Sequence, residues 1–117
     1  MNYIDGFVAA VPNANRAQYQ LHAAKSAEIF KEYGALRVVE CWGTDVPEGK
    51  LTSFTMAVQR QESESVLFSW IEWPSREVRD AAWEKLMADE RMNPATNPMP
   101  FDGKRMIYGG FQAILEA

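Results

Sequence analysis

The chain has 117 residues, 47 % of them hydrophobic and 24 % charged, which suits one hydrophobic core and an ordinary globular surface. Its net charge of −4 argues against a nucleic-acid partner or an anionic-membrane partner, because both favour a basic surface. A single cysteine and a single histidine exclude an intramolecular disulfide and give no metal-binding pattern. We therefore expect one domain over residues 1–117 that carries no metal, haem, flavin or nicotinamide.

The N-terminal residues have neither the basic start nor the apolar stretch of a secretory signal. No apolar run approaches the ~18 residues that a membrane-spanning helix needs. These two features predict a cytoplasmic location.

The chain begins with a predicted strand and a predicted helix. Residues 3–11 are rich in β-branched and aromatic types and end at a proline, as a strand does. A helix is predicted over residues 15–33, with Asn15 or Asn13 as its N-cap. Its apolar stripe consists of Tyr19, Ala23, Ser26, Phe30 and Tyr33. Gly34 is expected to end the helix in a left-handed conformation.

The middle of the chain predicts two more strands around a loop. Residues 36–43 form the second strand, and a loop follows. Residues 53–58 are expected to form a single helical turn. The third strand, over residues 65–73, has the strongest apolar pattern in the chain.

A second long helix and a last strand complete the prediction. Ser75 is the expected N-cap of a helix that fades near residue 89. Residues 93–102 contain three prolines and form a loop, and residues 105–115 form the last strand. The adjacent Gly109 and Gly110 indicate a bulge or a close approach to the backbone. The order β-α-β-β-α-β predicts an α+β fold of the ferredoxin-like type, with a four-stranded antiparallel sheet and its helices on one face.

The four predicted strands are apolar on both faces. In the third strand, for example, Phe68 and Trp70 point to one side and Leu67 and Ile71 to the other. Two helices can cover only one face, and an open apolar face of this size is unusual for a monomer. We therefore expect the chain to pair with itself as a homodimer, the alternative being that loops cover the second face.

Several sequence segments resemble the YbaA-like bacterial family, a domain of unknown function (number 1428). These segments are residues 5–7, 39–41, 68–71, 74–76 and, most specifically, 99–111. The resemblance spans essentially the whole chain. It implies a dimeric α+β barrel and brings no assigned activity or catalytic residue. Within the wider superfamily, cofactor-free monooxygenases, haem-degrading enzymes, small-lactone isomerases and ligand-sensing domains share the fold, which makes fold a weak guide to function.

Three residues are candidates for acid–base chemistry. Asp5 and Glu40 are acids inside apolar strands, where a carboxylate must be paired or must raise its pKa. The structural alternative is an ion pair with Arg37, Arg76 or Arg105, and Arg105 is the first candidate partner of Asp5. His22 lies at the edge of the helical stripe, where it is either a half-exposed boundary residue or a base.

Five other residues are candidates for contact with a ligand: Trp42, Ser69, Trp70, Arg105 and Tyr108. An aromatic wall with few polar groups is how proteins usually hold small organic molecules. We predict that such a molecule binds at the helix-free face of the sheet. Two alternatives stay open: a cofactor-free monooxygenase or isomerase, and an interaction protein whose aromatic residues only pack the dimer. The sequence leaves open whether the chain is an enzyme.

Overall fold

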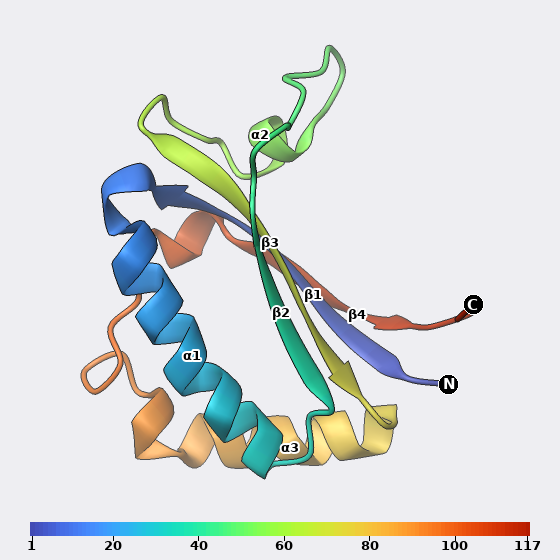
Figure 1. The fold of residues 1–117 in the computed structure, drawn as a ribbon. Helices are drawn as coiled ribbons and strands as arrows, with labels where there is room; N and C mark the ends of the chain where they lie inside the picture. The colour runs from blue at the N-terminus through green and yellow to red at the C-terminus, as the bar shows by residue number, and fades with distance from the viewer.

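A computed structural model describes all of residues 1–117 and shows an α+β fold built on one antiparallel sheet (Figure 1). Its four strands are β1 (Tyr3–Pro12), β2 (Arg37–Trp42), β3 (Glu64–Trp73) and β4 (Ile107–Gln112). The strand order across the sheet is β2-β3-β1-β4, and every neighbouring pair is antiparallel. The four-stranded antiparallel sheet that the sequence predicts is therefore confirmed.

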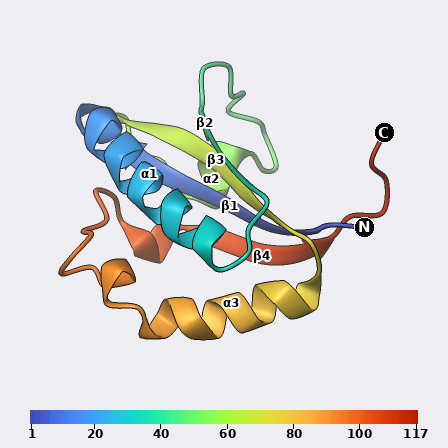
Figure 2. The ribbon, with the colours of Figure 1, turned by 60° about the horizontal axis from the view of Figure 1, so that its bottom comes forward.

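Two long helices, α1 (Arg16–Glu32) and α3 (Arg76–Ala88), cover one face of this sheet (Figures 1 and 2). The largest apolar cluster lies between them and the strands, and it contains Tyr3, Ile29, Phe30, Ala35, Ile71, Trp73, Ala82 and Leu86. The short helix α2 (Phe54–Ala57) lies on the other face, where Val58 packs against Val8 and Val66. The helices therefore share one face except for this single turn.

Local sequence signals explain most helix ends. Ser75 and Ser53 cap α3 and α2, since each hydroxyl accepts a hydrogen bond from the backbone N–H three residues later. Gly34 follows α1 with φ of +114°, a conformation that favours glycine. Asn15 holds the N-cap position of α1, as predicted, directly after the 3-10 turn η1 (Asn13–Asn15), but its side chain makes no capping bond there. Its amide donates instead to the carbonyl oxygen of Pro100.

The last strand is shorter than predicted. Residues 105–115 were expected to be extended, but β4 spans only Ile107–Gln112. Arg105 lies instead in the 3-10 turn η3 (Gly103–Arg105), where the carboxylate of Asp102 accepts a hydrogen bond from the backbone N–H of Lys104. A local side-chain cap therefore competes with the strand pattern at this position.

The helix-free face of the sheet keeps a large apolar area open beyond α2. Phe68, Ile107 and Phe111 are all more than 40 % exposed there. A shallow groove on this face runs over the same three residues and Trp70. No helix in the structure is both long enough and apolar enough to cross a lipid bilayer.

Candidate functional site

The structure divides the predicted ligand residues between the two faces of the sheet. Ser69 lies on the helix-covered face beside Glu40 of the neighbouring strand, whereas Trp70 lies on the helix-free face. Trp42 and Tyr108 share the register of the helix-covered face. The five predicted ligand residues therefore do not form one common site, because neighbouring residues in a strand point to opposite sides.

Asp5 is buried and fully paired, but its partner is not the one expected. Arg79 of α3 holds it, with Nη2 2.7 Å from Oδ1, so the predicted pair with Arg105 is wrong. The indole nitrogens of Trp73 and Trp83 donate to Oδ2 at 2.8 and 2.9 Å. Both carboxylate oxygens are thus saturated, which gives Asp5 a structural role in joining α3 to the sheet.

Arg105 is committed to a second buried ion pair. Its two Nη atoms lie 2.8 and 2.7 Å from the carboxylate oxygens of Glu64, which is only 5 % exposed. The hydrogen bonds that Arg105 donates to the Glu64 carboxylate hold the pKa of Glu64 below its ordinary value, and the same bonds raise the pKa of Arg105. The guanidinium also contacts Asp102. Arg105 therefore fixes η3 to the start of β3 rather than offering a free charge to a ligand.

The remaining aromatic candidates divide between two surface grooves: Trp42 borders one between α1 and β2, and Trp70 and Tyr108 both border the shallow groove on the helix-free face. Trp42 lies under the guanidinium of Arg16, 5.2 Å from the ring centroid. Trp70 donates its indole hydrogen to Glu72 at 2.9 Å. Tyr108 is 73 % exposed at the edge strand.

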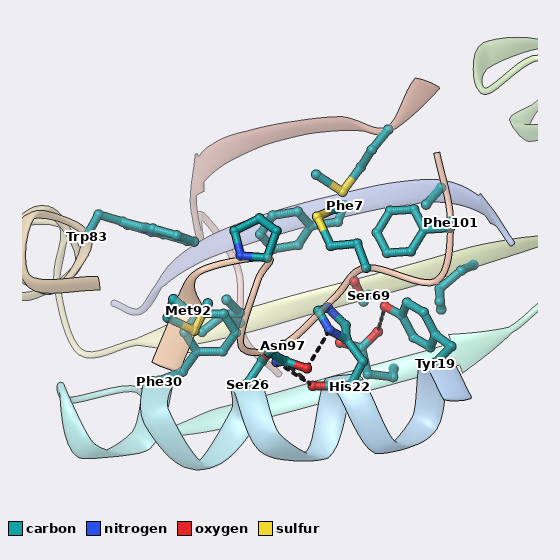
Figure 3. Close-up of a pocket in the computed structure, with 18 residues that line it drawn as sticks. Phe7, Tyr19, His22, Ser26, Phe30, Ser69, Trp83, Met92, Asn97 and Phe101 are labelled. Atoms are coloured by element: carbon teal, nitrogen blue, oxygen red, sulfur yellow. Dashed lines mark hydrogen bonds between the residues drawn. The ribbon is translucent and has the colours of Figure 1, made fainter. Parts of the chain in front are cut away.

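An apolar pocket, which we call the inner pocket, lies between the helix-covered face of the sheet and α1 and α3 (Figure 3). Its volume is about 250 Å³, and 12 of its 18 lining residues are hydrophobic. The loop between α3 and η3 closes it with Pro94, Asn97, Met99 and Phe101. Polar atoms reach it from Tyr19, His22, Ser26, Glu40, Ser69 and Asn97. The sequence-predicted residues Glu40, Ser69 and His22 therefore do meet, inside the fold.

Glu40 forms one polar corner of the inner pocket. The hydroxyl of Tyr19 donates a hydrogen bond to its Oε1 at 2.6 Å (Figure 3). Glu40 also borders an outer groove between α1 and β2, so the residue as a whole reaches solvent while its carboxyl group is partly desolvated. This desolvation raises the pKa of Glu40, and hydrogen bonds from Tyr19 and Ser69 oppose the rise. Burial, together with the charge of Glu40, raises the pKa of the Tyr19 hydroxyl.

His22 and Asn97 form a second polar corner. The His22 Nδ1 lies 3.0 Å from Oδ1 of Asn97, which is only 6 % exposed (Figure 3). Asn97 Nδ2 donates to the hydroxyl of Ser26 at 3.2 Å, and that hydroxyl donates to the His22 carbonyl oxygen at 3.0 Å. This closed network ties the closing loop to α1.

Sequence reasoning missed Tyr19 and Asn97 as site residues. Tyr19 and Ser26 were counted in an apolar stripe, although both carry a hydroxyl on the face that α1 turns inward. An asparagine in a proline-rich loop gives no signal of burial. Only the position of the loop over α1 reveals the part that Asn97 plays.

The acidic and histidine side chains form no group of three or more that could hold a metal ion. Several polar side chains of the inner pocket are instead hydrogen-bonded to one another, Tyr19 to Glu40 and His22 to Asn97. Every buried side-chain nitrogen and oxygen has a hydrogen-bond partner.

The chain is similar to known proteins over nearly its whole length. Residues 2–103 match the model of a family described as "Protein of unknown function (DUF1428)". The chain is 60 % identical over 116 residues to "Uncharacterized protein YbaA" of Escherichia coli strain K12, with 99 % of each chain covered. A protein of the same description from Shigella flexneri shows the same identity and coverage. Neither description names a ligand, a reaction or a partner.

Proposed function

The chain belongs to the bacterial DUF1428 family, as its resemblance to the YbaA-like proteins predicted, and from this premise we propose that it binds a small, largely apolar organic molecule in the inner pocket. The observation that carries the proposal is the pocket itself. Its walls are apolar and its two polar corners are fixed by hydrogen bonds within the protein. Ligand sites in proteins combine these same features.

The size of the pocket limits the ligand. A volume of about 250 Å³ lies near the lower end of the range for ligand pockets. It suits a molecule of one or two rings with one polar end. The raised pKa of Glu40 favours a ligand whose polar end is neutral, because burying an anion beside a carboxyl group would be costly.

The pocket favours ligand binding over a purely structural role. In a protein that serves only as an interaction module, the space between sheet and helices would be filled by side chains at close packing. Here polar groups line an open space within the fold instead. The alternative of a cofactor-free oxygenase or isomerase would use the same pocket.

We also propose that the chain is a single ferredoxin-like domain that pairs through its helix-free sheet face to form a dimeric α+β barrel. The strand order and the placement of α1 and α3 support the ferredoxin-like assignment. The exposed Phe68, Ile107 and Phe111 support a second copy as the cover, because an apolar patch of this kind is unusual on a monomer. A stable pair would bury more than roughly 1,000 Å² in total.

Binding can be tested by filling the pocket. Ala23 is buried on α1 and lines the inner pocket, whereas the next residue, Ala24, is exposed and does not line it. Titration with one- and two-ring probes such as 2-naphthol, followed by tryptophan fluorescence, should give saturable binding. Ala23→Leu should weaken it strongly and Ala24→Leu should leave it unchanged. Equal binding to both variants, or no saturable binding to any probe, would refute the proposal.

A further inference from the structure

The hydrogen bonds around Asn97 fix the protonation pattern of the His22 ring. Asn97 Nδ2 lies near two oxygens, the Ser26 hydroxyl at 3.2 Å and the His22 backbone carbonyl at 3.5 Å. The carbonyl oxygen can only accept, so the amide group must turn its NH₂ toward that side. Its oxygen therefore faces the ring, and His22 Nδ1 must carry the hydrogen that it donates.

The second ring nitrogen is consequently a free base. In neutral imidazole only one nitrogen carries a hydrogen, so a hydrogen on Nδ1 leaves a lone pair on Nε2. Nε2 makes no hydrogen bond to the protein, and no buried polar side-chain atom lacks a partner. Nε2 is therefore accessible, on a ring that lines the inner pocket.

Neighbouring rings fix the orientation of this base. The ring of His22 lies beside those of Tyr19 and Phe101, at centroid distances of 6.1 and 6.4 Å. Glu40 lines the same pocket, and its desolvated carboxyl group takes up a proton more readily than an ordinary glutamate. His22, with its tautomer fixed, and the Glu40 carboxyl group, which can donate a proton, thus line the same apolar pocket.

We infer that His22 is a catalytic base for proton transfer on the molecule in the inner pocket, and that Asn97 is its positioning residue. The inference rests on the proposed binding function and deepens it by naming the substrate class. That class is a small, largely apolar ketone with a C–H bond next to its carbonyl group. No lysine or cysteine lines the pocket, and both serines there are engaged in hydrogen bonds.

The step balances without a further reactant. Nε2 takes the proton from the carbon next to the carbonyl, and the electrons of that C–H bond form a carbon–carbon double bond. The carbonyl π electrons move to oxygen, which accepts a hydrogen bond or a proton from Glu40. The proton on Nε2 is replaced by one from solvent, so its delivery to the same carbon exchanges the hydrogen, and delivery to another carbon of an unsaturated ketone moves the double bond. The carbonyl re-forms in the same step, and any proton on its oxygen goes back to Glu40.

The experiment uses 2-tetralone, a two-ring ketone with acidic C–H bonds, and measures binding and chemistry separately. Binding is followed by NMR of ¹³C-labelled methionine methyl groups, since Met92, Met99 and Met106 line the pocket. Chemistry is followed as exchange of the C–H hydrogens next to the carbonyl for deuterium in D₂O, against protein-free buffer. ¹⁵N NMR of the His22 ring reports which nitrogen carries the hydrogen.

We expect wild-type protein to bind 2-tetralone, to accelerate exchange and to show hydrogen on Nδ1. His22→Gln should lower the exchange rate roughly a hundredfold. Asn97→Leu should lose both exchange and the Nδ1–H signature, and Asn97→Asp, which can still accept from Nδ1, should retain both. Lys25→Gln, on the exposed side of α1, should change nothing.

Binding without accelerated exchange, or exchange that survives His22→Gln, overturns the inference and leaves the binding function intact. If ¹⁵N NMR shows the hydrogen on Nε2 of His22 in the wild-type protein, the inference is overturned. This test needs no variant. Failure of 2-tetralone to shift the methyl signals overturns this inference, and failure of every one- and two-ring probe overturns the binding function as well.

Discussion

Arg79 on α3 holds Asp5 on β1 through two nitrogens, with Nη2 2.7 Å and Nε 3.1 Å from the same carboxylate oxygen, Oδ1. The two residues are 74 positions apart in the chain. Two tryptophan indoles complete the shell of donors around the carboxylate. This ion pair ties the last long helix to a central strand.

Asp5→Asn should therefore destabilise the protein by about 2–4 kcal/mol, because Arg79 loses its counter-charge in a largely buried setting. Urea denaturation at neutral pH measures the change. Asp80→Asn is the matched control, since Asp80 pairs with the same arginine at an exposed position. Equal losses in the two variants would contradict a special role for Asp5.

Gly110 lies directly under this ion pair. A Cβ at this position would come within 2.5 Å of the Tyr3 hydroxyl and 2.8 Å of Arg79 Nη2, which Asp5 holds in place. Gly110→Ala should cost about 1 kcal/mol or more. Gly109→Ala is the control, because its Cβ would meet only Phe111 at 3.4 Å, an ordinary contact. Thermal melts that shift equally in both variants would refute the prediction.

The ion pair between Arg105 and Glu64 should stabilise the fold, as the pair between Arg79 and Asp5 does. Arg105→Met leaves the Glu64 carboxylate without its cation and should lower the free energy of unfolding, measured by urea denaturation, well beyond the effect of an exposed pair. Arg37→Met is the control, since Arg37 lies 3.8 Å from Glu72 at the surface and should matter by no more than about 0.5 kcal/mol. Because the pKa of Glu64 is lowered in the folded protein, this contribution to stability is present above the ordinary glutamate pKa. It should be lost as pH falls.

Glu40 should show the opposite dependence on pH. Its pKa is raised by folding, so between the ordinary pKa and the raised one the folded state holds a proton that the unfolded chain has released. Stability from this group therefore falls as pH rises through that window. Urea denaturation at several pH values within this window should show the free energy of unfolding of Glu40→Gln rising relative to that of the wild type as pH rises. Above the window the difference should stay constant. Glu28→Gln, exposed on α1, should show no such trend, and a flat difference for Glu40→Gln would contradict the assignment.

The proposed dimer depends on the helix-free face. Phe111→Glu places a charge in the exposed apolar area of that face, and we expect it to give a monomer in analytical ultracentrifugation where the wild type is a dimer. Met87→Glu is the control, because Met87 is even more exposed than Phe111 but lies on α3, on the opposite side of the sheet. A monomeric wild-type protein would rule the assembly out.

The order and type of the main elements could be predicted from the sequence because they depend on local patterns. Alternating and helical periods mark the strands and helices, and Ser75 and Gly34 mark two helix ends through their own backbone chemistry. The prediction that the Asp5 carboxylate must be paired or must raise its pKa also follows from the local pattern, because Asp5 lies within an apolar strand. Strand alternation was likewise sufficient to separate Ser69 from Trp70, and the prediction of a shared site failed on a rule that the sequence already offered.

The partners themselves were decided only by the tertiary structure. The sequence contains several arginines that could pair with Asp5, and the packing of α3 against β1 selects Arg79 and leaves Arg105 to Glu64. The inner pocket exists because a loop with no periodic pattern folds over α1 and buries Asn97 against His22. Pairing and enclosure depend on distances between segments far apart in the chain, and local propensities, which act over a few residues, carry no information about those distances.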